Sequence, residues 1–435
     1  MKQRRLPSSA SWIPILWLTI ISSRPVSFWL QCIGIESGAT NNLDGNPTDL
    51  AIFLGLMLAA VIVLARRNFA WAGFIQGNKS LILLYLYLAL TALWAEHSFP
   101  TLKRAMKDFG SVLVALVMLT EQSPMDVIRI AFVRIAYVLF PLSIIFIKYF
   151  PDIGRQASRG GDSMFRGVCM HKSSLGCLVF LFGLFILIDL LEIRRNGGKR
   201  NKRLALWVRY GLLVMGGWLM YTCGSVTSLI CFTLGAAILW ASARLVRMGN
   251  PARMIFRYAA LLACVFILEK TFDVSTVVLQ ALGKNKTLTG RTEIWDMVEE
   301  ANTPVLTGTG FYSFWGTREA ERIQEHFAGV MNSAHNGFLD MYLDGGLVGV
   351  VLLVVLVLGW GGRSLGRMLR GSLFGRVAFM VWLLGLFYNN SETAFFRLDP
   401  VWFTLLLMMI ECPPVFRSTE TGQLSTQGEP ALQAA

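Results

Sequence analysis

The sequence has 435 residues, of which 54% are hydrophobic and 15% are charged, and its mean hydropathy is +0.54. Soluble domains carry roughly 25% charged residues, so this composition excludes a soluble enzyme. The formal net charge is +13, from 40 Lys and Arg against 27 Asp and Glu. These basic residues cluster in short stretches between apolar runs, which argues against a nucleic-acid-binding protein. The composition predicts an all-α polytopic membrane protein.

Apolar runs long enough to cross ~30 Å of hydrocarbon as helices recur along the whole chain. We predict about twelve transmembrane helices, at 11–31, 50–65, 80–95, 109–120, 127–150, 174–192, 207–222, 225–243, 254–270, 337–359, 374–390 and 398–411. Arg24-Pro25 interrupts the first run. The start MKQRR before an apolar run also fits a signal peptide, but the absence of a convincing small-residue cleavage site favours an uncleaved span.

Lys and Arg counts in the short loops predict the orientation. The loop IRRNGGKRNKR after the sixth run is strongly basic, whereas IGIESGATNNLDGNPTD after the first run has no basic residue. Both termini are therefore expected on the cytoplasmic side. The predicted organisation is transmembrane helices 1–9 over residues 1–270, an outward-facing loop with short helices over 271–336, transmembrane helices 10–12 over 337–411, and a disordered cytoplasmic tail over 412–435.

Cysteine and histidine spacing gives no local metal motif. The seven cysteines make no CxxC pair, and the four histidines make no HxxxH or HxH pair. Neither a disulfide framework nor a zinc site is indicated, and no Walker loop suggests coupling to ATP. We predict no metal and no cofactor, with a metal site assembled across several loops left open as the alternative.

The outward-facing loops are unusually basic. The loop EHSFPTLKRAMKDFG carries Arg104 and Lys107, the loop after the fifth run carries Arg166 and Lys172, and Arg291 precedes the helix-like TEIWDMVEEA. Contact with anionic lipid headgroups would explain any one of them. A cluster would instead hold a phosphorylated substrate, a task for which the forked donors of arginine are suited.

The long loop 271–336 contains two further features. LTGTGFYSFWG combines Gly308 and Gly310, which permit a tight turn, with Tyr312 and other aromatic residues that fit a membrane interface or stack on sugars. TREAERIQEHFAGV is expected to form an amphipathic helix with Ile323 and Phe327 on one face. This helix would cover the site.

The sharpest local pattern is NSAHNGFLDMYLDGGLVGVVLL. Ser333 is expected to cap a helix and so to place His335 on its first turn. Asn336, Asp340 and Asp344 follow at four-residue spacing, a polar stripe that should face a cavity and not lipid. A histidine at the end of a span is more often a plain interfacial residue, but the stripe and the nearby arginines favour a functional one.

These residues resemble a known family. His335 and Asn336, nine further residues and then Gly346 to Val350 in a GxxG pattern resemble the signature of O-antigen ligases. GRTEIW at 290–295, GTGF at 308–311 and RGVCMHKSSLG at 166–176 are similar to other parts of that family. The superfamily also includes O-antigen polymerases and exopolysaccharide polymerases, and ALWAEHSFPTLKRAMKDFG and PLSIIFIKYFPDIGR look closer to the exopolysaccharide type.

The resemblance implies a metal-independent, inverting glycosyltransferase of the GT-C class. It would lie in the bacterial inner membrane among membrane lipids, with its site in a periplasmic loop between spans 9 and 10. The implied donor is a glycan on undecaprenyl pyrophosphate, and the acceptor is a sugar hydroxyl on lipid A–core (a ligase) or on another glycan (a polymerase). The alternative from another class is a polysaccharide transporter or flippase without catalytic activity.

The resemblance also assigns roles to residues. His335 would activate the acceptor hydroxyl, while Arg291 and Arg166 would bind the pyrophosphate, with Arg155 or Arg159 as substitutes for Arg166. The expected catalytic residues are His335, Arg291 and Arg166, and the expected substrate-binding residues are Arg104, Lys107, Lys172, Asn336 and Tyr312.

Overall fold

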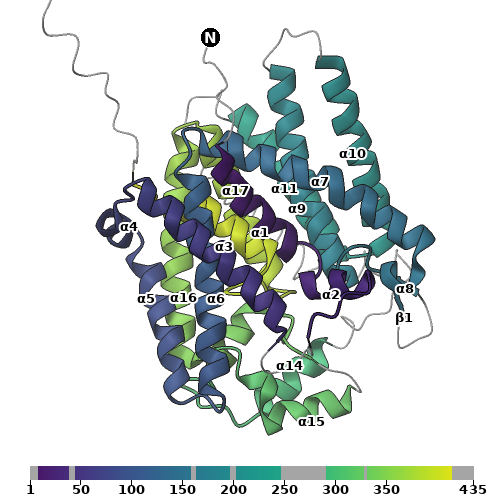
Figure 1. Ribbon diagram of the computed structural model, residues 1–435. Helices are drawn as coiled ribbons and strands as arrows, with labels where there is room; N and C mark the ends of the chain where they lie inside the picture. Colours follow the sequence, from purple (N-terminus) through teal and green to yellow (C-terminus); the bar gives the residue numbers. More distant parts are fainter. Residues whose placement is uncertain are drawn as a thin grey trace, which may run out of the picture.

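The computed structural model describes residues 8–38, 45–157, 163–195, 202–245, 291–327 and 331–413. These residues are mostly helical (Figure 1). The helices are α1 (Trp12–Ile21), α2 (Val26–Cys32), α3 (Pro47–Arg66), α4 (Trp71–Gly77), α5 (Lys79–Leu90), α6 (Ser98–Leu119), α7 (Pro124–Tyr149), α8 (Pro151–Gly154), α9 (Lys172–Arg195), α10 (Lys202–Cys223), α11 (Val226–Leu245), α14 (Arg291–Glu300), α15 (Arg318–His326), α16 (Gly337–Leu369), α17 (Leu373–Asn389) and α18 (Pro400–Met409), with short 3-10 turns at Ser9–Ser11, Thr91–Leu93 and Phe314–Gly316. Two short strands, β1 (Arg155–Ala157) and β2 (Ser163–Phe165), form an antiparallel hairpin.

The prediction of an all-α polytopic membrane protein is confirmed. Among the described residues, five helices are long and apolar enough to cross a membrane: α3, α7, α9, α10 and α16. The first predicted span is a bent pair, because α1 and α2 meet at 71° around Arg24-Pro25. Shorter apolar helices occupy the predicted spans at 80–95, 225–243, 374–390 and 398–411. The total of twelve stays a prediction, and the ninth span, residues 271–290 of the loop and the tail from 414 lie outside the described residues.

Helix α6 corrects one expected boundary. The sequence predicts a loop over EHSFPTLKRAMKDFG and a span that starts only at residue 109, but α6 begins at Ser98 and continues to Leu119. Thr101, Ala105 and Asp108 are buried at helical spacing, whereas Leu102 and Met106 are exposed. The basic residues of this stretch therefore lie on a helix with one buried face, and a helix fixes their spacing more firmly than a loop would.

Local capping explains where several helices begin. The side chain of Asn46 accepts a hydrogen bond from the Thr48 amide at 2.9 Å, and Pro47 occupies the first position of α3. Asp399 accepts from Val401 at 2.7 Å directly before α18. A polar cap followed by proline satisfies an orphan N–H group and presets the backbone for the first turn.

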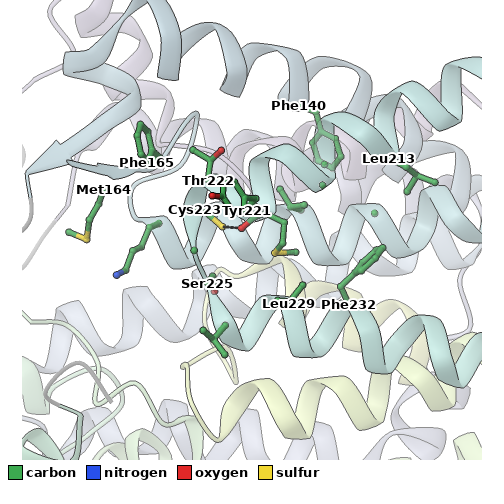
Figure 2. Close-up of a pocket in the computed structure, with 18 of the residues that line it drawn as sticks. Phe140, Met164, Phe165, Leu213, Tyr221, Thr222, Cys223, Ser225, Leu229 and Phe232 are labelled. Atoms are coloured by element: carbon green, nitrogen blue, oxygen red, sulfur yellow. Dashed lines mark hydrogen bonds between the residues drawn. The ribbon is translucent and has the colours of Figure 1, made fainter. Parts of the chain in front are cut away.

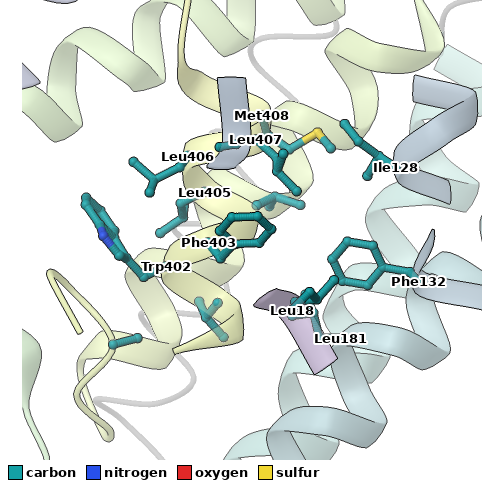
Figure 3. Packing of buried hydrophobic residues seen from close by; sticks show 14 of the residues in the cluster. Leu18, Ile128, Phe132, Leu181, Trp402, Phe403, Leu405, Leu406, Leu407 and Met408 are labelled. Atoms are coloured by element: carbon teal, nitrogen blue, oxygen red, sulfur yellow. The ribbon is translucent and has the colours of Figure 1, made fainter. Parts of the chain in front are cut away.

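The centre of the bundle is formed around α18. Every residue of this helix is buried, which is typical of a helix that is apolar on all sides and enclosed by other helices. Figure 3 shows Phe403 of α18 together with Leu18 of α1, Phe132 of α7 and Leu181 of α9 in one cluster. The core thus joins helices from both ends of the sequence.

A break in α16 receives the loop that precedes it in sequence. Gly346 has φ +60 and ψ −161 inside the helix, and this break frees backbone groups on either side. The amide of Thr309 donates to the carbonyl of Leu343 at 2.8 Å, and the amide of Leu347 donates to the carbonyl of Val305 at 2.9 Å. The GTGF turn is thereby fastened to the GxxG segment by main-chain hydrogen bonds.

The two short helices α14 and α15 lie together at the lower end of the bundle in Figure 1. They share a small apolar cluster that contains Ile294, Val298, Ile323 and Phe327. The expected helices in TEIWDMVEEA and TREAERIQEHFAGV are confirmed, and the first of them ends at Glu300. Their role as a cover over the site stays a prediction.

Candidate functional site

Two charged side chains and a histidine from distant parts of the sequence meet at the start of α16. Nη2 of Arg291 donates to Oε1 of Glu392 at 2.6 Å, and Nδ1 of His335 lies 3.1 Å from Oε2 of the same carboxylate. Glu392 is buried, whereas 41% of the His335 side chain is exposed. The carboxylate orients Arg291 and His335 and leaves the imidazole accessible. The structure thus brings together two of the three residues expected to be catalytic.

Sequence reasoning did not single out Glu392. Burial alone would raise the pKa of this carboxyl group, but the hydrogen bond from His335 and the charge of Arg291 outweigh burial, so its pKa lies below the ordinary value. Glu392 therefore carries a negative charge at neutral pH. The one signal in the sequence was an acidic residue in the short segment SETAFF between two apolar runs.

The segment around His335 differs from the expectation. Helix α16 begins at Gly337 with Asn336 as its N-cap, so Ser333 is not the cap and His335 is not on the first turn. His335 instead has φ +54, a left-handed conformation that is uncommon for a residue with a side chain. Oδ1 of Asn336, which was expected to bind substrate, accepts from the amides of Phe338 and Leu339 at 3.0 and 3.2 Å.

The predicted polar stripe on α16 holds this segment in place. Both oxygens of Asp340 lie 3.1 Å from the amide of Ala334, directly before His335. Oδ2 of Asp340 also accepts from the Thr393 hydroxyl at 2.5 Å, next to Glu392. Asp340 and Asp344 are both buried. The stripe avoids lipid as expected, but it faces hydrogen-bonding loops and not an open cavity.

Arg166 lies on a loop that is fastened by a second arginine. Nε of Arg166 donates to the carbonyl of Ile153 at 3.0 Å, and Nη2 of Arg24 donates to the same carbonyl at 2.5 Å. Nε of Arg24 also donates to the carbonyl of Cys169 at 2.9 Å. Arg24 is buried at the bend between α1 and α2. From the sequence, Arg24 was expected only to interrupt a span, and its hydrogen bonds to this loop were not predicted.

His171 is influenced electrostatically both by Arg166 and by His335 and Glu392. Burial lowers the pKa of His171, and the positive charge of Arg166 and, when protonated, that of His335 lower it further. His171 therefore lies within electrostatic range of both Arg166 and His335. Of the two substitutes proposed for Arg166, Arg155 donates from Nε to the carbonyl of Ile147 at 2.9 Å, and residue 159 lies outside the described residues.

Arg104, Lys107 and Tyr312 line a separate polar space beside α6. Nη1 of Arg104 donates to the carbonyl of Tyr312 at 2.7 Å. The three side chains contribute to the wall of a cavity of about 350 Å³ that also contains Ser333 and Thr393, the near neighbours of His335 and Glu392. Burial raises the pKa of Tyr312 to about 12, so its phenol is neutral.

Lys172 lies elsewhere, at the first turn of α9. It lines a largely apolar cavity of about 920 Å³ between α7, α9, α10 and α11. Figure 2 shows Phe140, Leu213, Leu229 and Phe232 around this space, with Met164 and Phe165 of β2 at one side. The structure therefore separates Lys172 from the other predicted substrate-binding residues, at the edge of a space suited to a hydrocarbon chain.

No three His, Cys, Asp or Glu side chains come together as metal ligands within the part of the chain that the structure describes. The cationic groups near His335 are instead the guanidinium group of Arg291 and, on the neighbouring loop, that of Arg166. Metal-free chemistry stays a prediction.

Comparisons with known proteins show which proteins the chain resembles. Residues 163–354 match a family model described as O-antigen ligase, a range that contains Arg166, Arg291 and His335. Over 321 residues the chain is 26% identical to the exopolysaccharide production protein ExoQ of Rhizobium meliloti (strain 1021), covering 70% of this chain and 68% of that protein. Both similarities connect the chain with ligase- or polymerase-type activity in polysaccharide synthesis. The resemblance predicted from the sequence is confirmed: the chain is similar to O-antigen ligases over residues 163–354 and to an exopolysaccharide production protein over most of its length.

Proposed function

We propose that this protein is a glycosyltransferase that moves a glycan from undecaprenyl pyrophosphate to a sugar hydroxyl. The acceptor is either lipid A–core or another glycan chain. The single observation that carries the proposal is the contact of Arg291 and His335 with the two oxygens of Glu392, at 2.6 and 3.1 Å. One carboxylate orients a phosphate-binding cation and a proton acceptor side by side, which is what transfer from a pyrophosphate to a hydroxyl requires.

His335 is proposed as the general base. Its Nδ1 lies against the Glu392 carboxylate, which favours the tautomer with the proton on Nδ1 and a free lone pair on Nε2. The acceptor hydroxyl gives its proton to Nε2 as its oxygen bonds to the anomeric carbon. The bond from that carbon to the pyrophosphate oxygen breaks in the same displacement, so the configuration inverts and the electron pair leaves with the pyrophosphate.

Arg291 and Arg166 are proposed to stabilise the leaving pyrophosphate. Fixed guanidinium groups neutralise charge that develops on phosphate oxygens, and they do so without a divalent ion. Glu392 holds Arg291, and the carbonyl of Ile153 holds Arg166, so little reorganisation is needed during the reaction. The enzyme is proposed to be independent of metal.

The large apolar cavity supports a lipid-linked donor. Its volume of about 920 Å³ and its lining by apolar side chains suit part of a polyprenyl chain. The ammonium group of Lys172 on its wall would then meet the polar end of that lipid. The protein is proposed to lie in the bacterial inner membrane with both termini cytoplasmic and residues 271–336 in the periplasm.

An assay with the purified full chain in lipid nanodiscs tests the function. The donor is a glycan on undecaprenyl pyrophosphate, offered with lipid A–core and with a free glycan as acceptors, without nucleotide or ion gradient. We expect glycan transfer with release of undecaprenyl pyrophosphate, and we expect EDTA to leave the rate unchanged. No transfer to either acceptor would contradict the proposal, and loss of activity that Mg²⁺ or Mn²⁺ restores would contradict the metal-free mechanism.

A further inference from the structure

The polar space beside α6 is larger than the cavity next to Tyr312 alone. A second cavity of about 580 Å³ shares four wall residues with it, Arg104, Lys107, Leu398 and Asp399. The two therefore adjoin along α6 and the segment before α18. We call the joined space the α6 cavity. Its size is that of an ordinary small-molecule site, for which 300 to 1,000 Å³ is typical, roughly the size range of an oligosaccharide end.

The α6 cavity is lined by near neighbours in sequence of His335 and Glu392 and does not include the proposed pyrophosphate ligands. Its walls contain Ser333, two residues before His335, and Thr393, directly after Glu392. Neither Arg291 nor Arg166 is among the residues that line it. A donor held by those two arginines would therefore leave the α6 cavity open to the second substrate.

Lys107 gives this cavity a cation that is available to a ligand. Its ammonium group lies 5.1 Å from the centre of the Phe53 ring and has no hydrogen-bond acceptor among the described residues. Of the three carboxylates on the same walls, Asp49 and Asp399 accept from protein donors, and Asp108 accepts from the Tyr85 hydroxyl through Oδ2 while its Oδ1 has no hydrogen-bond partner among the described residues. Asp49 accepts from the amide and hydroxyl of Ser27, and Asp399 caps α18.

Arg397 adds a second cation to the walls of the α6 cavity, next to Tyr312. Only 8% of Arg397 is exposed, and its Nη2 lies 3.1 Å from Oδ2 of Asp344. Its Nε and Nη1 are buried and have no hydrogen-bond partner among the described residues. The guanidinium carbon lies 3.5 Å from the centre of the Tyr312 ring. Buried donors left without partners are costly, and an anionic ligand would relieve that cost.

We propose that the α6 cavity binds the acceptor glycan and selects one that carries an anionic substituent, a carboxylate or a phosphate, through Lys107 with Arg397 behind it. This inference rests on the proposed function, because it names the second substrate of the same site. It specifies the expectation that Lys107 binds substrate, by assigning Lys107 to the acceptor. Tyr312 and Phe53 are aromatic residues on these walls, each with a cationic group against its ring.

The test uses the full chain in nanodiscs with saturating lipid-linked donor and three oligosaccharide acceptors. They differ only at one position, which is glucose, glucuronic acid or glucose phosphate. We expect the KM of both anionic acceptors to be about tenfold lower than that of the neutral one, since a charge-assisted hydrogen bond has about that effect on binding. Added salt should reduce the difference. Equal KM values for the three acceptors would overturn the proposal, and comparison of the two anionic acceptors shows which group is preferred.

Variants of Lys107 distinguish an effect on acceptor binding from an effect on donor binding. Lys107→Met should raise the KM of the anionic acceptors about tenfold, to the neutral value, and leave the KM of the donor and kcat unchanged. Lys107→Arg keeps the charge and should retain the preference, which guards against a folding defect in the Met variant. Lys79→Met, at an exposed lysine outside the α6 cavity, is the matched control. A rise in donor KM with Lys107→Met would instead assign Lys107 to the pyrophosphate.

A binding experiment without donor tests the anionic acceptor site separately from the transferase activity. Titration of the glucuronic-acid oligosaccharide into the protein without donor should show binding that the neutral analogue lacks and that Lys107→Met abolishes. Such binding without any transfer would sink the transferase and retain the anionic-glycan site. Glycan transfer with no preference for the anionic acceptor would contradict the anionic-glycan site and retain the transferase function.

Discussion

Glu392 is the residue on which the proposed chemistry depends, although it would touch neither phosphate nor acceptor. It contacts side chains that lie 101 and 57 residues away in the sequence. Removing either neighbour leaves a buried carboxylate with one partner, and removing Glu392 leaves Arg291 without its counter-charge. Glu392 is thus a positioning residue, and His335 is the group that meets the substrate.

His335→Ala should lower the transfer rate by ~10²-fold or more, because it removes the general base. Donor binding should survive, since the imidazole is not assigned to the pyrophosphate. His326→Ala is the matched control: this histidine is about half exposed on α15, where it contacts Glu293. Transfer rate and the amount of membrane-inserted protein should be measured together, and a fully active His335→Ala protein would end the assignment.

Glu392→Gln should lower thermal stability in a pH-dependent way. Because the pKa of Glu392 is lowered by folding, its charge stabilises the native state above the ordinary carboxyl pKa of about 4.3, and this contribution is lost as the pH falls through the folded value. At pH 7 the cost should be about 3–5 kcal/mol, as for other broken buried ion pairs.

Thermal unfolding of the two proteins between pH 3 and pH 8 checks this prediction. The difference in Tm should shrink at the acidic end. Glu293→Gln serves as the control, because Glu293 is more than half exposed and its contact with His326 should contribute little. A difference that is constant across the pH range would show that the charge of Glu392 is not responsible.

At the scale of elements, the break in α16 explains why glycine stands in the GxxG pattern. A Cβ atom on Gly346 would lie 2.3 Å from the carbonyl carbon of Leu306, and its φ of +60 belongs to a region that glycine tolerates best. The docked loop positions Tyr312, whose amide donates to Oδ1 of Asp344 at 3.0 Å. One glycine therefore fixes a loop on the wall of the α6 cavity.

Gly346→Ala should destabilise the protein by about 2–4 kcal/mol and reduce transfer, since the loop can no longer dock without a shift. Gly359→Ala is the matched control on the same helix. Nothing lies within 4 Å of a Cβ added there, so alanine should be neutral or should stabilise the helix slightly. Thermal unfolding in detergent and transfer rates would distinguish them, and equal behaviour of the two variants would contradict this account.

Features that depend on neighbouring residues could be predicted from the sequence, whereas contacts between residues far apart in the sequence could not. Apolar runs predicted the long described helices near their observed places, because burial in lipid acts on consecutive residues. The start of α6 was missed, since Lys103 and Lys107 suggested a loop although a helix with one buried face carries them. Glu392 and Arg24 were missed because their partners lie more than 50 residues away in the sequence. Only the folded arrangement of helices shows those contacts.

On the scale of the whole molecule, the parts assigned to chemistry gather at one end of the bundle. Helices α14 and α15 and the start of α16 lie at the lower end in Figure 1, while the far end of α9 lies at the upper end. This polarity matches the distribution of basic loops, from which the lower end is predicted to face outward. We therefore expect the lower end of the bundle on the outer side of the membrane and the upper end on the cytoplasmic side.

Fusion of a reporter enzyme that is active only outside the cytoplasm tests this orientation. A fusion after His326, the last residue of α15, should be active, and a fusion after Arg195, the last residue of α9, should be inactive because the adjoining basic loop is retained inside. Immunoblots provide the control for equal amounts of the two fusions. Activity at Arg195 with none at His326 would reverse the predicted topology.

The contacts of Arg24 have a consequence for the order in which the protein matures. Its carbonyl partners at Ile153 and Cys169 lie 129 and 145 residues later in the sequence. At 5–20 residues per second, a ribosome needs about 7 to 30 seconds to make that intervening chain. The bend between α1 and α2 thus enters the membrane with a charged group whose final partners do not yet exist, and water or lipid headgroups must solvate it meanwhile. The bend between α1 and α2 can therefore form its final hydrogen bonds only after the loop that carries Arg166 has been synthesised.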